Sequence, residues 1–173
     1  MDLIRTIHEA LPDTSFIAED LGFLTPEVIR LQKESGFPGM KVLQFAFDDR
    51  EAGNYMPETY TPNTVCYTGT HDNETLVQWL EQISKKNLKT AMRYLGIKDE
   101  KELPWAMICC GMQSVSDLFV AQMQDYLELG AEARMNKPSS LNSQNWTWRV
   151  TAEQLKPKLA EKIAELTEKS HRI

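Results

Sequence analysis

Two short segments of this 173-residue chain place acidic side chains between an apolar run and the start of a helix. In the first segment, residues 16–18 are apolar and Glu19 follows them directly. In the second, residues 65–67 lead through a Gly-marked turn to His71 and Asp72. Parallel α/β folds hold their catalytic side chains at the carboxyl ends of strands, just before the next helix. The pattern therefore predicts a parallel α/β fold in which two acidic segments face one substrate.

Apolar runs and helix signals alternate along the rest of the chain. The runs predict four strands, at residues 15–18, 41–45, 64–68 and 118–123. Apolar residues spaced three and four apart predict helices at residues 4–11, 26–35, 73–84, 88–95, 104–114 and 152–169. A long polar connection covers residues 48–63, and connections of this length are usually functional or mobile. Strands that alternate with helices in this way are typical of a parallel sheet.

The charge balance and the cysteines argue against several kinds of partner. The net charge is −6, whereas a nucleic-acid-binding surface needs clustered Lys and Arg. No apolar run approaches the roughly 20 residues of a membrane-spanning helix, and no secretory signal pattern opens the chain. The three cysteines, of which Cys109 and Cys110 are adjacent, have neither metal-site spacing nor a disulfide framework. We therefore expect a cytoplasmic protein with reduced, buried thiols and no metal, nucleic-acid or membrane partner.

Five separate segments resemble one enzyme family. They begin with Ala-Glu-Asp-Leu-Gly, end with Asn-Trp-Thr-Trp-Arg, and lie at residues 18–22, 38–48, 67–75, 130–136 and 145–149. In this order they resemble the 4-α-glucanotransferases, the amylomaltase or disproportionating enzymes of the α-amylase superfamily. The resemblance covers roughly residues 3–170 and is specific because the five motifs occur together. It implies transfer of α-1,4-glucan segments between maltodextrins, without a metal or organic cofactor.

The resemblance also implies a fold. It identifies the four predicted strands with strands five to eight of a (β/α)₈ barrel, accompanied by extra helices. A complete barrel needs roughly 200 residues or more, so we expect residues 1–173 to form a single partial barrel domain that lacks the N-terminal half. Such a half leaves two open sheet edges and an uncovered apolar face that includes Ile17, Val42, Val65 and Val120. We expect self-association or pairing with the missing half, unless the outer helices fold over the exposed face.

Retaining glycosyl transfer requires two carboxyl groups. One attacks the anomeric carbon, and the other protonates the leaving oxygen and later deprotonates the sugar hydroxyl that accepts the glucan. An acid that works near neutral pH needs a pKa raised by burial or by a nearby carboxylate. By the resemblance, Glu19 is this acid/base residue. From the residues alone, a solvent-exposed glutamate after a strand is the alternative.

The second acidic segment has two candidate roles. Asp72 resembles the family's third carboxylate, which holds substrate hydroxyls and stabilises the oxocarbenium-like transition state, and His71 resembles a histidine that hydrogen-bonds the same sugar. The alternative is a helix cap, because Asp and Asn are favoured there, although Asn73 can cap while Asp72 enters the site. A metal-dependent His-Asp phosphohydrolase would need further ligands, and the remaining histidines, His8 and His171, lie in ordinary helical contexts.

Three further residues are predicted to bind substrate. Asp20, next to Glu19, is expected to be a supporting acid of the site. Asp49 resembles a family residue on the acceptor side, and a plain turn residue is the alternative. Asn136 resembles a loop residue that contacts the glucan, although residues 139–144 replace the Gly/Pro-rich stretch that is usual in the family.

Aromatic side chains near these segments are candidates for stacking on sugar rings. Trp146 and Trp148 are two residues apart, so they face opposite sides of an extended segment. One of the two could stack on a sugar, but packing in the core is the favoured interpretation. Tyr55 and Tyr60 lie in the long connection beside the strand ends, where packing within the loop is the alternative to sugar binding.

One signature of the family does not occur in this sequence. The family's nucleophile is an aspartate in an Arg-x-Asp-His context on the fourth barrel strand, and no such sequence is present. Double displacement without its nucleophile should be slower by many orders of magnitude. We therefore expect a fragment of a 4-α-glucanotransferase that does not turn over alone. The alternatives are a non-catalytic half-barrel for assembly or glucan binding, and a hydrolase with a different nucleophile.

Overall fold

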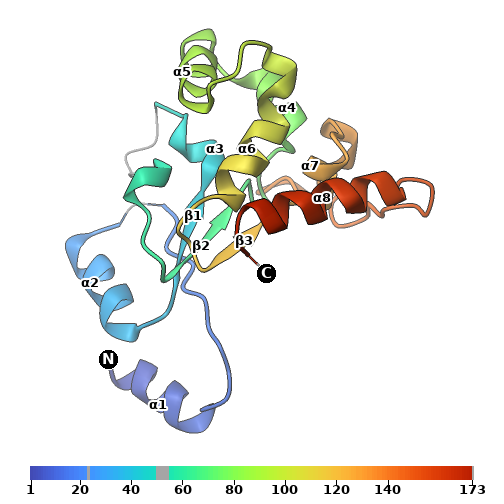
Figure 1. The fold of residues 1–173 in the computed structure, drawn as a ribbon. Helices are drawn as coiled ribbons and strands as arrows, with labels where there is room; N and C mark the ends of the chain where they lie inside the picture. Colours follow the sequence, from blue (N-terminus) through green and yellow to red (C-terminus); the bar gives the residue numbers. More distant parts are fainter. Residues whose placement is uncertain (23, 50–54, 173) are drawn as a thin grey trace.

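The structure, a computed structural model, describes residues 1–22, 24–49 and 55–172. At its centre lies a parallel sheet with the strand order β1-β2-β3. The three strands are β1 (Gly39–Val42), β2 (Thr64–Tyr67) and β3 (Leu118–Val120). Helices that follow β2 lie above the sheet and to its right in Figure 1, whereas the two N-terminal helices extend below it. The prediction of a parallel α/β fold is confirmed.

The pairing of the strands brings their carboxyl ends to one edge of the sheet. Val42 lies opposite Tyr67, and Tyr67 lies opposite Val120. Two hydrogen bonds keep the three segments in register just beyond the strand ends. The N–H of Thr68 donates to the Val120 carbonyl at 3.2 Å, and the N–H of Gln44 donates to the Thr68 carbonyl at 3.2 Å. The loops that leave the three strands therefore start side by side.

The helices begin and end at recognisable cap residues. For α2 (Pro26–Ser35), the Thr25 hydroxyl accepts from the Val28 N–H at 3.4 Å, and Gly36 ends the helix in the left-handed conformation with a φ of 72°. For α5 (Lys85–Leu95), Ser84 is the N-cap. The other helices are α1 (Asp2–Ala10), α3 (Leu43–Ala46), α4 (Leu76–Gln82), α6 (Leu103–Met112), α7 (Met123–Tyr126) and α8 (Pro157–Lys169), with 3₁₀ turns at Pro57–Thr59, Glu100–Glu102 and Ala131–Ala133.

Several predicted boundaries are wrong for local reasons. The second predicted strand, residues 41–45, ends at Val42 because Leu43–Ala46 forms one helical turn. The last helix begins at Pro157 instead of residue 152, because the proline ring is tolerated only in the first turn of a helix. Part of the long connection, residues 50–54, lies outside the described residues.

Residues 15–18, which we predicted to form a strand, are not part of the sheet. The N–H of Ala18 donates to the Pro38 carbonyl at 2.9 Å, just before β1. On the edge of β1 that faces this segment, the next amide is the N–H of Met40, and it donates to the side chain of Asp20 at 2.6 Å. A side chain thus occupies the place of the second ladder bond, and the segment runs beside β1 without pairing as a strand.

One face of the sheet carries the hydrophobic core. Cys66 on β2 is fully buried there, against side chains from helices α4 to α6. Gly111 allows α6 to approach β3, because a Cβ at this position would overlap the ring of Phe119. The buried members of the core are Leu43, Phe47, Tyr60, Cys66, Leu76, Trp79, Ala91, Leu103, Met107, Ile108, Met112 and Leu166.

The cysteines and the loop tyrosines also belong to this interior. Cys66 is buried, Cys109 and Cys110 are partly buried, and all three are free thiols, as predicted. Tyr55 and Tyr60 are each 6% exposed, and the Tyr60 hydroxyl donates to the Tyr55 carbonyl at 2.7 Å. The loop-packing alternative is therefore correct for these two tyrosines.

The opposite face of the sheet is covered unevenly. Laterally paired residues point to the same face, so Met40, Val65 and Leu118 lie in one row across the strands. Their exposed fractions are 8%, 1% and 53%. In the next row, Val42 is fully buried and Val120 is 44% exposed. Tyr67 of β2, between these two residues, is half-buried. The predicted uncovered face is therefore present at β3 and absent at Met40, Val42 and Val65.

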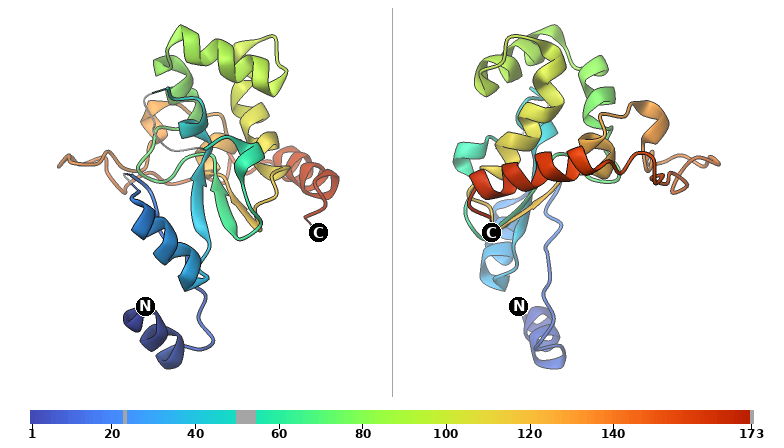
Figure 2. Two further views of the ribbon diagram at one scale, coloured as in Figure 1. Left: turned by 90° about the vertical axis from the view of Figure 1, so that its left-hand side faces the viewer. Right: turned by 45° about the vertical axis from the view of Figure 1, so that its right-hand side comes forward.

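The N-terminal helices stand apart from this body. Figure 2 shows α1 and α2 projecting from the sheet, with α1 farthest from the core. Helix α1 has no buried residue, and its contact with the α2 end is made by His8, which lies 3.4 Å from the Ser35 carbonyl and packs on Phe37. Across the described residues, no helix is both long and apolar enough to cross a membrane.

Candidate active site

The loop after β2 is organised by its own side chains. The Asn73 side-chain oxygen accepts from the backbone N–H and from the hydroxyl of Thr70, both at 2.8 Å, which closes a tight turn around His71 and Asp72. Thr75 accepts from the Gln78 N–H at 3.2 Å and caps α4. The helix cap that we considered for Asn73 is therefore made by Thr75, while Asn73 shapes the turn that presents Asp72.

Asp72 lies at the centre of a polar cluster. Its Oδ1 accepts from the Asn136 amide at 2.6 Å and lies 3.3 Å from Nε2 of His71. The backbone N–H of Asn136 donates to the His71 carbonyl at 3.1 Å. The structure thus brings three predicted site residues together, although 64 positions separate Asp72 from Asn136. Within the described part of the chain, Oδ2 of Asp72 accepts no hydrogen bond.

Arg134 joins the two loops of this cluster. Its mostly buried guanidinium donates to Oε1 of Glu74 at 2.7 Å, to the Asp72 carbonyl at 2.7 Å and to the Asn136 carbonyl at 2.8 Å. Three donors of one rigid fork therefore fix both loops in one arrangement. Our sequence interpretation assigned no role to Arg134 or Glu74, because the partners are 60 residues apart. The available signal was their place inside two of the five motifs.

A buried carboxylate supports the same loop from below. Asp125 on α7 is 1% exposed and accepts from the Thr68 hydroxyl at 2.6 Å and from the Leu76 N–H at 2.8 Å. Thr68 and Leu76 are the two ends of the loop that carries Asp72, so one side chain holds both ends. Burial raises the pKa of Asp125 to about 6, and the two hydrogen bonds act in the opposite direction.

The first acidic segment is held more loosely. Glu19 is exposed, and the described residues offer its carboxylate no hydrogen bond or ion pair. The pKa of Tyr67 at the end of β2 is raised, first by the burial of its own hydroxyl and second by the negative charge of Glu19. Asp20, in contrast, accepts from the Met40 N–H, and its carboxylate fills the space that a Cβ on Gly39 would need.

Asp49 lies away from the Asp72 cluster. Its carboxylate accepts from Lys86 at 2.7 Å and from the Asn87 amide at 3.1 Å, at the start of α5, and these bonds lower its pKa. A pocket of about 540 Å³ is nevertheless lined both by Asp49 and by Asn73 and Glu74, which follow Asp72 in the chain. A larger pocket of about 800 Å³ lies among α5, α6 and α8 and contains none of the predicted site residues.

The pocket beside Asp49 contains one buried polar atom without a partner. Gln44 is 1% exposed and donates through its amide to the Glu74 carbonyl at 2.8 Å. Its side-chain oxygen has no hydrogen-bond partner among the described residues. In the described part of the chain, no group of three or more His, Cys, Asp or Glu side chains could hold a metal ion.

The parallel sheet and the polar cluster around Asp72 together indicate a class of protein. Carboxylates at the carboxyl edge of a parallel sheet are the arrangement of α/β enzymes that act through acidic side chains. A family model for glycoside hydrolase family 77, described as 4-alpha-glucanotransferase, matches residues 1–155. The chain therefore belongs to the 4-α-glucanotransferase family, which confirms the resemblance.

Individual relatives agree with the family match. The chain is 44% identical over 168 residues to the 4-alpha-glucanotransferase of Clostridium butyricum, covering 96% of this chain and 34% of that protein. It is 40% identical over 178 residues to the Thermus thermophilus enzyme of the same name, covering 99% and 35%. The solved structure of amylomaltase from Streptococcus agalactiae in complex with acarbose superimposes with a TM-score of 0.91 at 33% identity, covering 98% of this chain and 34% of that one. The chain thus spans about a third of the length of these relatives.

Proposed function

We propose that this chain supplies two of the catalytic carboxylates of a 4-α-glucanotransferase. Asp72 holds the hydroxyls of the sugar that carries the scissile bond, and Glu19 acts as the acid/base. The observation that carries the proposal is the cluster around Asp72. Asn136 and His71 engage one oxygen of its carboxylate and Arg134 fixes its backbone, while the other oxygen remains available to substrate. A preorganised acceptor of this kind suits an oxocarbenium-like transition state.

The reaction we propose is a retaining double displacement. Glu19 donates its proton to the glycosidic oxygen while a nucleophile attacks the anomeric carbon, and the covalent glycosyl intermediate then reacts with a sugar hydroxyl that gives its proton to Glu19. The nucleophile and the burial that the acid requires come from protein outside this chain segment. The family's Arg-x-Asp-His context is not in the sequence, and Glu19 is exposed. The chain alone is therefore proposed to be inactive.

We propose that the remaining predicted residues act at the edges of this site. Asp49 and the pocket of about 540 Å³ beside it bind the acceptor glucan, and a pocket of this size suits a sugar residue. Asn136 acts through Asp72 as well as on the glucan. Asp20 acts by holding the Glu19 segment against β1, because its carboxylate is already engaged by Met40.

We also propose how the sheet completes a barrel. The segment at residues 15–18 and strands β1, β2 and β3 correspond to strands five to eight, and residues 1–173 form one partial barrel domain. The exposed Leu118 and Val120 on β3 favour pairing of this edge with another polypeptide segment or a second copy. A cytoplasmic location is part of the same proposal.

A non-catalytic glucan-binding or assembly module is the second candidate. The exposure of Glu19 favours it, since the described residues provide no partner that would hold this carboxylate in a catalytic geometry. The two candidates make opposite statements about Glu19. Only the first requires its carboxyl group.

The decisive experiment combines this chain with the complementary two thirds of the Clostridium butyricum relative. Maltotriose is incubated with each polypeptide alone and with the mixture, and products are separated by chromatography, while sedimentation reports which species form. Glucose and longer maltodextrins are expected only from the mixture and should disappear with Glu19→Gln or Asp72→Asn, whereas Glu9→Gln on exposed α1 is the matched control. A stoichiometric complex without transfer would support the binding module. Transfer by the chain alone that depends on Glu19 would overturn the proposed need for an outside nucleophile.

A further inference from the structure

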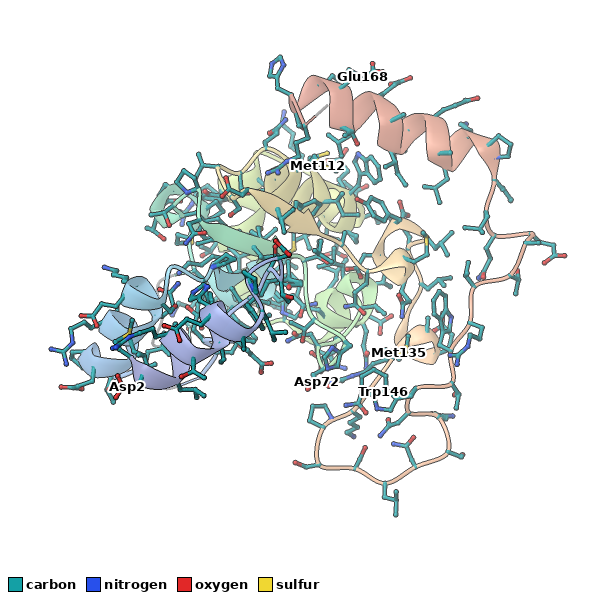
Figure 3. The ribbon with its side chains drawn as sticks, turned by 90° about the horizontal axis from the view of Figure 1, so that it is seen from below. Asp2, Asp72, Met112, Met135, Trp146 and Glu168 are labelled. Atoms are coloured by element: carbon teal, nitrogen blue, oxygen red, sulfur yellow. The ribbon has the colours of Figure 1, made fainter. Side chains whose placement is uncertain are left out.

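Trp146 is an exposed aromatic side chain beside the Asp72 cluster. Its exposed fraction is 53%, whereas Trp79 is 8% exposed and lies in the core. The rings of Trp146 and His71 have their centroids 4.9 Å apart with their planes inclined by 42°. Because Nε2 of His71 lies 3.3 Å from Oδ1 of Asp72, the indole is two contacts away from the Asp72 carboxylate, whose Oδ2 is the oxygen proposed to bind the sugar. In Figure 3, Trp146 and Asp72 lie near each other in the view from below, and the loop between Met135 and Trp146 extends away from the body of the chain.

The backbone at Trp146 is held in an unfavourable conformation. Its φ is 65°, in the left-handed region that bulky residues rarely adopt. Three hydrogen bonds hold the backbone at this position. The Trp146 N–H donates to the Met135 carbonyl at 2.7 Å, and Arg149 donates to the Trp146 carbonyl at 3.1 Å. The N–H of the next residue, Thr147, donates to the Gln144 carbonyl at 3.3 Å. Strain of this kind persists where the surrounding structure over-determines it and is common at binding sites. The strained position keeps the indole beside His71.

The loop before Trp146 is tied together by hydrogen bonds of its own side chains. The Asn142 side-chain oxygen accepts from the Gln144 and Asn145 amides at 2.9 and 3.0 Å. The Asn145 side chain in turn accepts from the Lys137 N–H at 3.1 Å. These bonds are made within residues 137–145, where the family usually has a Gly/Pro-rich stretch before the Asn-Trp-Thr-Trp-Arg motif.

We infer that Trp146 is a stacking platform for a glucose ring of the bound α-1,4-glucan, next to the ring held by His71 and Asp72. One face of a glucopyranose presents only C–H groups, and an indole offers a large apolar surface that is lost from water when the two stack. Core packing, the interpretation favoured by the sequence, does not account for an indole that is half exposed. This inference rests on the proposed function, because it names a further contact of the same site.

Direct binding of maltoheptaose to the whole chain tests the platform. Titration calorimetry compares wild type with Trp146→Ala, Trp146→Leu and Trp146→Phe, and Trp105→Phe, in the helical layer, is the matched control. Because they lack an aromatic face, Trp146→Ala and Trp146→Leu should bind maltoheptaose with a Kd roughly fivefold or more above that of wild type. The Kd of Trp146→Phe should stay within about twofold of wild type. The ring-specific rescue by Phe distinguishes stacking from a loss of structure.

A second measurement uses the unaltered protein. N-bromosuccinimide oxidises exposed indoles, and maltoheptaose should protect Trp146 from oxidation in peptide mass spectra. Equal affinity of Trp146→Ala and wild type, or unprotected Trp146 at saturating maltoheptaose, would overturn the inference while Asp72→Asn still weakened binding. If wild type binds no maltoheptaose, the glucan site proposed for this chain fails and the platform fails with it.

Discussion

The two acidic segments follow the same sequence pattern but reach very different states in the folded chain. Asp72 is held by three residues from two segments that follow β3: Asn136 on its carboxylate and Arg134 on its backbone, both just after the 3₁₀ turn Ala131–Ala133, and Asp125 of α7 beneath its loop. Glu19 is exposed, and its segment is held by the Ala18 amide and the Asp20 side chain. One half of the proposed site is therefore preorganised by this chain, and the other half is only attached to it.

The difference follows from where each segment lies in the sheet. The Asp72 loop leaves the central strand, so neighbours from both sides, including α7 after β3, can reach it. The Glu19 segment runs along the outer side of β1, where this chain supplies contacts from one side only. The contrast indicates that the geometry of a segment at an open sheet edge depends on whatever pairs with that edge.

The largest expected change in stability concerns the preorganised half of the proposed site, around Asp72. Arg134→Ala should lower the free energy of unfolding by about 3–4 kcal/mol, because it leaves the Glu74 carboxylate and two carbonyls without their donor in a mostly buried place. Arg30→Ala removes an exposed pair with Glu34 and should cost under about 0.5 kcal/mol. Urea denaturation measures both. An Arg134 variant as stable as the Arg30 variant would show that the two loops do not need the guanidinium.

The sequence predicted what depends on local patterns. Helix starts at Pro26 and ends at Gly36 and Gly96 follow from residues next to each other in the chain. The position of Asp72 at the end of a buried strand follows from the apolar run before it. Partners distant in sequence, such as Arg134 and Glu74, could not be predicted, because no local pattern specifies which acidic side chain a given arginine contacts.

The failure at residues 15–18 has the same origin. An apolar run predicts a strand only if backbone partners are available, and here Asp20 occupies one of them with its side chain. Ile17 is 48% exposed as a result of having no covering layer on its outer side. Trp146 is a related case, because its two-residue spacing from Trp148 gave no hint of the left-handed backbone that turns the indole toward His71.

The next expected effect is a pH dependence that originates below the Asp72 loop. Because burial raises the pKa of Asp125 to about 6 in the folded chain, from 3.8 for the free side chain, the folded state binds the proton more tightly. The stabilising contribution is therefore full below about pH 4 and is lost as the pH rises through 6. The shift of about two units corresponds to roughly 2–3 kcal/mol.

Asp125→Asn isolates this contribution from all other titrating groups. The amide keeps an oxygen for the Leu76 N–H and cannot ionise, so the stability of wild type relative to the variant should fall by roughly 2–3 kcal/mol between pH 4 and 7. Urea denaturation of both proteins across that range provides the difference. A difference that is flat with pH, or that rises, would mean that Asp125 titrates alike in the folded and unfolded chain.

The smallest expected effect concerns the loosely held half. Asp20→Ala removes the acceptor of the Met40 N–H and should lower the free energy of unfolding by about 1 kcal/mol, since the bond is only partly buried and water can replace part of it. Asp20→Asn retains a side-chain oxygen and should stay close to wild type. Hydrogen exchange gives the sharper readout: the Met40 amide should exchange much faster in the Ala variant, while the amides of Asn73 and Leu76 in the Asp72 loop keep their protection. Faster exchange in both regions would show that the two acidic segments are coupled within this chain, and the contrast between a preorganised half and an attached half would no longer hold.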